Sequence, residues 1–78
     1  MNIKILGTGC PNCLRLEQNT REALKQLGKE AAVEKVTEIA DIMSYGIMST
    51  PALVVDEAVL VVGMVPSVEE LKNKLANL

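Results

Sequence analysis

The chain has 78 residues, a formal net charge of −2 and 49% hydrophobic residues, which predicts one packed domain over residues 1–78 rather than a disordered segment. Scattered lysines and arginines in a slightly acidic chain with a single aromatic residue argue against nucleic-acid binding. No stretch approaches the roughly 20 apolar residues of a membrane span, and the N-terminal apolar run is too short for a signal peptide, so we expect a cytoplasmic protein without membrane contact.

The first half of the chain predicts a strand, a long helix and a second strand. Apolar residues indicate a strand over residues 2–6, which a glycine-containing turn then ends. A helix is expected from Pro11 to Leu27, because proline suits the first helical position and Gly28 suits the position after the last turn. Residues 31–36 predict the second strand. The buried side of the helix is expected to hold Cys13, Leu16, Thr20, Ala23, Leu24 and Leu27.

A short helix and a hairpin are expected next. Thr37 is predicted to cap a helix that runs from Glu38 to about Tyr45. Two apolar, β-branched runs over residues 52–55 and 58–62 predict an antiparallel hairpin. An Asp-Glu pair joins them. We expect a turn longer than two residues, because the favoured two-residue turns need positive φ, which glutamate disfavours.

The last predicted element is a capped helix. Ser67 and Glu70 have the spacing of a capping box, in which two side chains satisfy free N–H groups at a helix start. The predicted order is therefore β-α-β-α-β-β-α, an α/β arrangement. The helix between the first two strands predicts that they pair in parallel, and the nearly continuous apolar strands predict a sheet covered on both faces. The buried side of the last helix is expected to hold Val68, Leu71, Leu75 and Leu78.

Both cysteines stand at the start of the first helix, in the sequence Cys10-Pro11-Asn12-Cys13. This spacing brings the two sulfurs to one side of the first turn, within reach of a disulfide. The helix N-terminus favours a thiolate on Cys10, whereas Cys13 points to the apolar side, where burial favours the neutral thiol. This asymmetry suits thiol–disulfide exchange, in which Cys10 attacks a disulfide and Cys13 resolves the mixed disulfide.

Two other interpretations of the cysteine pair stay open at this point. A purely structural disulfide would contribute only about 2 kcal/mol, across a segment that the helix already holds together. Soft ions such as Cu(I) or Zn(II) also bind paired thiolates, so a small metal-carrier module using Cys10 and Cys13 is the alternative function. The chain has no histidine, and two thiols supply only two of the four ligands of zinc. Small metal-binding domains with this motif also end on a strand rather than a helix.

These residues together resemble the thioredoxin/glutaredoxin superfamily. The cysteine motif after the first strand, Thr50-Pro51 ahead of a hairpin and a terminal capped helix match its pattern over nearly the whole chain. The nearest match is the group of small, glutaredoxin-sized proteins called redox-active disulfide proteins. The resemblance implies a thioredoxin fold with a four-stranded mixed sheet and helices on both faces. It also implies a thiol–disulfide oxidoreductase that serves electron transport and cell redox homeostasis.

The resemblance further implies roles for individual residues. Cys10 would be the nucleophile and Cys13 the resolving cysteine, and no cofactor is implied beyond their disulfide. The Thr50-Pro51 peptide bond would be cis, and the Thr50 backbone would bind an extended substrate strand. Further substrate contacts are expected from Gly9, Pro11 and Asn12.

The implied partners are other proteins. Protein disulfides would be the substrates, and a flavoprotein similar to thioredoxin reductase would supply electrons to a monomeric chain. Dependence on glutathione is not favoured, because Asn12 stands where glutathione-using members carry a tyrosine, and their aspartate after the hairpin is missing.

Two further expectations concern buried residues. The acidic residue that thioredoxins keep buried behind the cysteines has no counterpart, since the first strand carries Lys4 instead. Met43 and Met64 are expected to fill the core, whereas Met48 is expected to reach the active-site loop.

Overall fold

The computed structural model describes residues 1–77 and confirms the predicted order of strands and helices. Its elements are β1 (Asn2–Leu6), α1 (Pro11–Leu27), β2 (Ala32–Val36), α2 (Ile39–Ser44), β3 (Ala52–Val55), β4 (Ala58–Val62) and α3 (Val68–Ala76). The second strand begins one residue later than expected. Leu78, expected on the buried side of the last helix, lies outside the described residues. No helix within residues 1–77 is long and apolar enough to cross a membrane.

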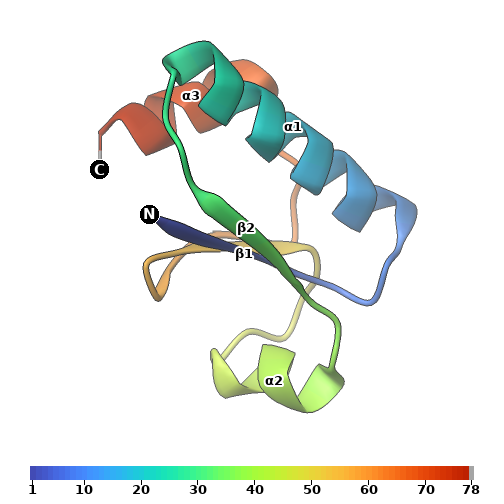
Figure 1. Cartoon of the computed structure of the whole chain (residues 1–78). Coiled ribbons are helices and arrows are strands. Elements are labelled where there is room, and N and C mark those ends of the chain that lie inside the picture. The colour runs from blue at the N-terminus through green and yellow to red at the C-terminus, as the bar shows by residue number, and fades with distance from the viewer. Residues whose placement is uncertain (78) are drawn as a thin grey trace.

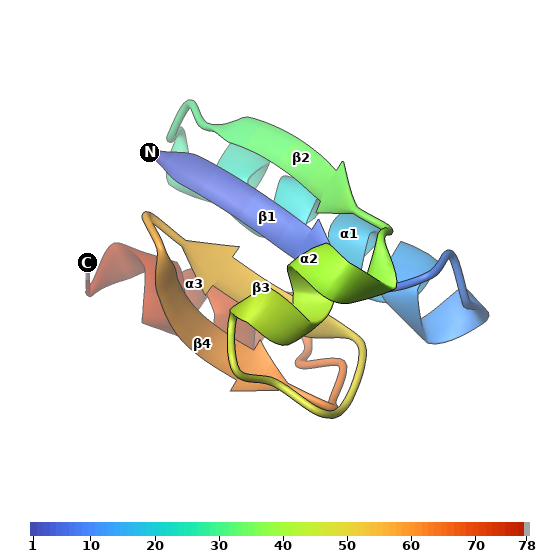
Figure 2. The ribbon, with the colours of Figure 1, turned by 90° about the horizontal axis from the view of Figure 1, so that it is seen from below.

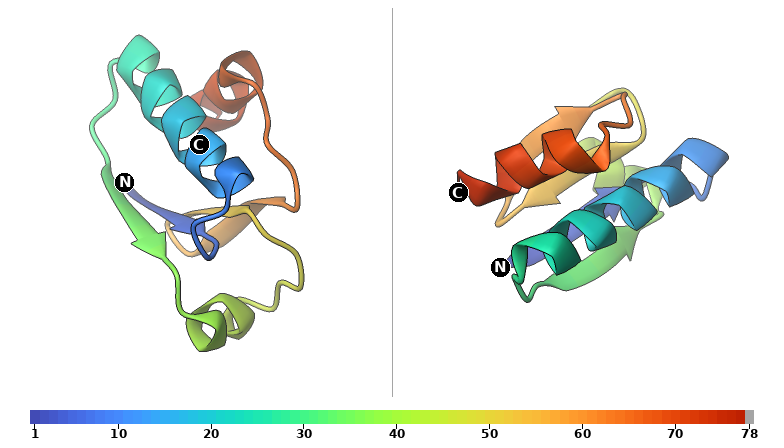
Figure 3. Two further views of the ribbon diagram at one scale, coloured as in Figure 1. Left: turned by 90° about the vertical axis from the view of Figure 1, so that its right-hand side faces the viewer. Right: turned by 90° about the horizontal axis from the view of Figure 1, so that it is seen from above.

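The four strands form one mixed sheet in the order β2-β1-β3-β4. β1 and β2 are parallel, as the intervening helix predicts, whereas β3 is antiparallel to both β1 and β4. Helices α1 and α3 lie side by side on one face of the sheet, and α2 lies alone on the other (Figure 1 and Figure 3). The expected α/β architecture, with helices on both faces of a mixed sheet, is therefore confirmed.

The alternation of side chains along the strands divides the apolar residues between two cores. On β1, Ile3 and Ile5 belong to the core under α1 and α3, whereas Leu6 belongs to the core under α2. Leu27 and Val68, both expected to be buried, pack against the first of these cores and are only partly buried. The larger core contains Ile3, Ile5, Leu16, Ala23, Leu24, Leu53, Val55, Val61, Leu71 and Leu75, and the smaller contains Leu6, Ile42, Ile47, Ala52 and Val54.

The hairpin is confirmed, but its turn is shorter than expected. Asp56 and Glu57 alone connect β3 to β4, and both have positive φ, of 48° and 70°. Asp56 is held by the first strand: its N–H donates to the Asn2 carbonyl oxygen at 2.8 Å, and its Oδ1 accepts from the Asn2 N–H at 2.8 Å. These tertiary hydrogen bonds help to hold a tight turn that a glutamate disfavours on local grounds.

Of the two side-chain caps that the sequence predicts from a serine or a threonine, one is confirmed. Ser67 caps α3 as expected, because its Oγ accepts a hydrogen bond from the Glu70 N–H at 3.2 Å. The prediction that Thr37 caps α2 is wrong. Glu38 is the N-cap residue of α2 and makes no side-chain cap hydrogen bond, while Thr37 lines a cavity beside Cys13.

Candidate active site

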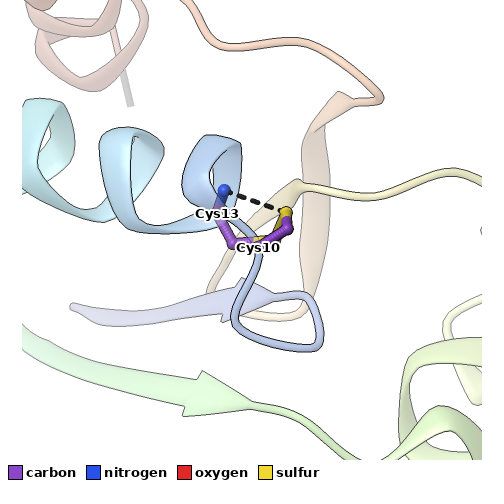
Figure 4. The surroundings of a disulfide bond; sticks show 2 residues. All are labelled: Cys10 and Cys13. Carbon is purple, nitrogen blue, oxygen red and sulfur yellow. Dashed lines mark hydrogen bonds between the residues drawn. A yellow bond between two sulfur atoms is a disulfide. The ribbon is translucent and has the colours of Figure 1, made fainter.

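The two cysteines lie where β1 ends and α1 begins (Figure 4). Pro11 is the first helical residue, so Cys10 is the N-cap residue, with an extended backbone of φ −68° and ψ 163°. The Cys10 Sγ accepts a hydrogen bond of 3.2 Å from the Cys13 N–H, which is the dashed line in Figure 4. The sulfurs form a disulfide, and the two Cα atoms lie 5.1 Å apart. The expected meeting of both thiols on one helical turn is therefore confirmed.

The two sulfur atoms have different surroundings. Cys13 is only 5% exposed and belongs to the buried side of α1, whereas Cys10 is partly exposed. Cys10 also lies at the positive end of the α1 dipole, with a backbone N–H directed at its sulfur. These features favour negative charge on the Cys10 sulfur. The site therefore combines one accessible and one shielded sulfur, an arrangement suited to stepwise thiol–disulfide exchange.

The Thr50-Pro51 peptide bond is cis, as the resemblance implies. Pro51 is buried, and its carbonyl oxygen accepts a hydrogen bond of 2.8 Å from the Gly63 N–H, which ties this loop to the end of β4. Thr50 is exposed. A Cβ atom at position 7 would lie 4.0 Å from the Thr50 Cβ and would also meet Cys13. Gly7 therefore lies next to both Cys13 and the Thr50 loop.

Gly7 is a site residue that the sequence analysis treats only as the end of a strand. It is buried, and a Cβ atom at this position would overlap the Cys13 Sγ. The close approach of the Cys13 sulfur to the end of β1 therefore requires a residue without a side chain. The signal in the sequence is a glycine that directly follows a strand, three residues before the first cysteine.

The other residues expected to contact substrate lie at the surface next to Cys10. Gly9, Pro11 and Asn12 are all exposed, on the loop before α1 and on its first turn. Gly9 has a φ of 90°, a left-handed conformation that glycine adopts without a Cβ clash. These three residues form an accessible rim beside Cys10, and their contact with substrate stays a prediction.

A buried carboxylate that the sequence analysis missed lies one turn beyond Cys13. Glu17 is 9% exposed and lines, with Gly7 and Cys13, a cavity of about 150 Å³. The expectation that no acidic residue lies behind the cysteines is therefore wrong, because the carboxylate comes from α1 and not from a strand. Its signal in the sequence is the four-residue spacing from Cys13, which puts both side chains on one side of the helix.

Two cations hold the Glu17 carboxylate. Arg21 Nε donates to its Oε2 at 3.1 Å, and Lys35 Nζ lies 3.3 Å from its Oε1. Burial alone would raise the pKa of Glu17, but hydrogen bonds from Arg21 and Lys35 outweigh burial, and the pKa is lowered. Glu17 therefore stays ionised at neutral pH, beside the cavity that Cys13 lines.

A second cavity, of about 290 Å³, opens on the α2 side of the sheet and is called the α2 groove below. The α2 groove is lined by Thr8, Ile39, Ile42, Met43, Ile47, Met48 and Thr50. The expectation that Met43 and Met64 fill the core is wrong, since both side chains are exposed. Met48 lies next to the Thr50 loop, as expected, and is exposed as well. The six-residue α2 is too short to bury every apolar side chain that this part of the chain carries.

Known proteins resemble this chain along nearly its whole length. Residues 1–76 match the family model described as a thioredoxin domain. A thioredoxin of Methanothermobacter thermautotrophicus is 46% identical over 76 residues, which cover 97% of this chain and 99% of that protein. A thioredoxin of Methanocaldococcus jannaschii is 38% identical over 73 residues, which cover 94% of this chain and 84% of that protein.

Proposed function

Because this chain belongs to the thioredoxin family and is a thiol–disulfide oxidoreductase, we propose that Cys10 is its attacking nucleophile and Cys13 its resolving cysteine. The observation that supports these roles is the asymmetry of the two sulfurs. Cys10 is the more accessible and has the helix N-terminus and a backbone N–H to favour its thiolate, whereas Cys13 is 5% exposed.

The proposed reaction has two exchange steps. The Cys10 thiolate attacks one sulfur of a protein disulfide, which forms a mixed disulfide and releases the partner's other sulfur as a thiolate that takes a proton from water. Cys13, after losing its proton, attacks the Cys10 sulfur. This second step forms the Cys10–Cys13 disulfide and releases the partner's remaining thiolate. Two electrons pass to the partner, and no cofactor beyond the two cysteines takes part.

The substrate strand is proposed to lie beside the Thr50-Pro51 loop. Thr50 is exposed next to the buried Pro51, and its backbone would pair with an extended chain laid along this loop. Gly9, Pro11 and Asn12 form the opposite rim around Cys10. A partner disulfide held between these two segments would present a sulfur to Cys10.

The wider role that we propose is that of a monomeric cytoplasmic reductase or electron relay. Its electrons would come from a flavoprotein similar to thioredoxin reductase, rather than from glutathione. The helix α3 after the hairpin favours redox exchange over a carrier of soft metal ions, because metal-carrier domains with this motif have a strand in that place.

A redox titration tests the proposed couple. The protein is equilibrated across dithiothreitol buffers and quenched with an alkylating agent, and the added labels are counted by mass spectrometry. We expect one two-electron transition, from two labels to none, at a potential of about −120 to −270 mV. Two labels at every potential, with copper or zinc co-purifying, would support the metal carrier instead.

Trapping experiments test the separate roles of the cysteines. Cys13→Ser should accumulate mixed disulfides with partner proteins, because the resolving step is blocked. Cys10→Ser should accumulate none. Equal trapping by the two variants would refute the assigned roles while leaving the dithiol couple intact.

A further inference from the structure

An open hollow with basic side chains lies between the C-terminal half of α1 and the start of β2. It has a volume of about 480 Å³ and is called the basic hollow below. Arg21, Lys25 and Lys29 line it, together with one carboxylate, Glu30, and apolar side chains of α1 and β2. Arg21 and Lys25 are exposed, and Lys29 is partly exposed. The basic hollow therefore presents three cations and a single carboxylate to the solvent.

Helix geometry places these cations on the β2 side of α1. Arg21 and Lys25 are four residues apart and so lie on one side of the helix. Glu17, one turn earlier, pairs with Arg21 at 3.0 Å and with Lys35 of β2 at 3.3 Å, which identifies that side. Figure 2 shows α1 behind β1 and β2, and α3 behind β3 and β4. The basic hollow therefore lies at the β2 edge of the molecule, away from α3.

The chain neutralises only part of this positive charge. Arg21 and Lys35 share the single carboxylate of Glu17. Lys29 donates a hydrogen bond of 3.3 Å to a carbonyl oxygen of α3, which carries no full charge. No ion pair within residues 1–77 includes Lys25 or Lys29. Even with the one carboxylate of the basic hollow counted, cations outnumber carboxylates here.

The charge is of the opposite sign over α2, the hairpin and the start of α3. Residues 38–70 contain no lysine or arginine. Their carboxylates are Glu38, Asp41, Asp56, Glu57, Glu69 and Glu70. An acidic partner is therefore attracted to the basic hollow and repelled by this part of the chain. Such a separation of charge steers a partner and also fixes its orientation.

The basic hollow lies on the same helix as the redox site. Because α1 rises 1.5 Å per residue, Arg21 and Lys25 lie about 16 and 22 Å along the helix from Cys10. The exposed side chains between them on this side are Leu14 and Gln18, which carry no charge. An extended chain covers about 3.3 Å per residue, so five to seven residues span this distance. A partner with its disulfide at Cys10 can therefore reach the basic hollow.

We propose that the basic hollow recruits disulfide partners that carry an acidic segment about five to seven residues from the disulfide. The carboxylates of the partner pair with Arg21, Lys25 and Lys29 while its disulfide lies at Cys10. This proposal deepens the proposed function and rests on it, because the same partner exchanges its disulfide with Cys10.

Charged peptides test this recruitment. Each peptide carries one cysteine as a mixed disulfide with 2-mercaptoethanol, and either three glutamates or three lysines six residues from the cysteine on both sides. The reduced protein should reduce the glutamate peptide about fivefold faster at low salt, with the ratio falling toward one at high salt. Rates with dithiothreitol correct for the reactivity of the peptides themselves. The net charge of −2 alone predicts the opposite order, so equal or faster reduction of the lysine peptide would refute the proposal.

Two matched lysines locate the effect. Lys25 and Lys74 are both exposed, and each lies in the last turn of its helix, so replacing either by glutamate changes the interaction with the helix dipole in the same way. Lys25→Glu should abolish or reverse the preference for the glutamate peptide, whereas Lys74→Glu should keep most of it. Lys25→Gln, a milder change, should lower the preference about twofold. Equal effects of Lys25→Glu and Lys74→Glu would mean that net charge decides the rates, which would refute a role of the basic hollow.

Two measurements separate this proposal from the proposed function. Reduction of bis(2-hydroxyethyl) disulfide reports the dithiol chemistry alone, so its absence would refute the exchange mechanism. Normal reduction of this small disulfide, with no preference between the two peptides, would refute the recruitment only. Binding of fluorescent peptides with serine in place of cysteine tests the basic hollow without exchange, and equal affinities for the glutamate and lysine peptides would also refute it.

Discussion

The two faces of the sheet are covered very differently. On one face, α1 and α3 pack side by side and bury the larger core, whereas on the other the six-residue α2 covers only the smaller core around Leu6 and Ile42 (Figure 3). Apolar side chains of the α2 region that a longer helix would bury stay exposed. The α1–α3 face therefore supplies most of the hydrophobic stabilisation, whereas the α2 face leaves apolar side chains accessible to other molecules.

The redox site lies where these two faces meet. Cys13 belongs to the buried side of α1, while Thr8 and Thr50 line the α2 groove. The Cys13 sulfur is thus held by the well-packed face, whereas Thr50, one of the proposed substrate contacts, lies on the thinly covered one. Stability and recognition can therefore change separately, and the following substitutions test that separation.

The largest contrast is expected between two fully buried leucines. Leu53 lies in the larger core and Leu6 in the smaller one, both on strands and both fully buried. Leu53→Ala should lower the free energy of unfolding by about 4 kcal/mol and Leu6→Ala by about 2.5 kcal/mol, because the short α2 can move into the space that Leu6 leaves. Urea denaturation of the oxidised proteins measures both. An equal or larger loss for Leu6→Ala would show that the α2 face is as rigid as the other.

A smaller effect is expected for the buried carboxylate on the α1 face. Glu17→Gln should lower the free energy of unfolding by about 1 to 2 kcal/mol at neutral pH. The substitution removes the negative charge with which Arg21 and Lys35 pair. The pKa of Glu17 is lowered in the folded chain, so its stabilisation is fully present above its usual pKa and is lost as the pH falls through the lowered value.

The pH dependence therefore identifies the cause. The difference in urea midpoint between Glu17→Gln and the unchanged chain should hold from pH 7 to about pH 5 and should shrink below about pH 4. Glu22→Gln, a substitution of an exposed glutamate on the same helix, should show no such trend. A difference that does not depend on pH would mean that Glu17 acts through its shape and not through its charge.

The smallest effect, of opposite sign, is expected at the turn between β3 and β4. Glu57 has a φ of 70°, which glycine adopts with less steric cost, and its ion pair with Lys4 is exposed. Glu57→Gly should therefore raise the free energy of unfolding by about 0.5 kcal/mol. Thermal unfolding by circular dichroism measures the change. A loss of stability would show that the Lys4 contact outweighs the backbone strain.

The elements that the sequence predicts correctly are those that local chemistry decides. Proline and glycine bracket α1, Ser67 caps α3, and β-branched runs form the hairpin, each within a few residues of its signal. The position of the cysteine pair is also predicted from local sequence, because a Cys-x-x-Cys spacing at a helix start brings both sulfurs to one side of the first turn. The cis bond before Pro51 was expected from family resemblance alone, since most bonds before proline are trans.

The predictions that fail concern residues whose partners are distant in the chain. The two-residue turn is held by hydrogen bonds between Asp56 and Asn2, and the carboxylate of Glu17 is paired partly by Lys35 from β2. Met43 has the spacing of a core residue on a helix, yet α2 exposes it because that helix covers so little of the sheet. Among these features, only the four-residue spacing of Glu17 from Cys13 gives a local signal.

The sequence alone is therefore enough to predict the order of the elements and the place of the dithiol at the start of α1, because these follow from the conformational preferences of neighbouring residues. The tertiary structure decides which charges surround the dithiol, why residue 7 must lack a side chain, and which apolar side chains remain exposed beside Thr50. These features arise only when segments far apart in the chain pack together, since burial, close approach and charge pairing are properties of the assembled fold.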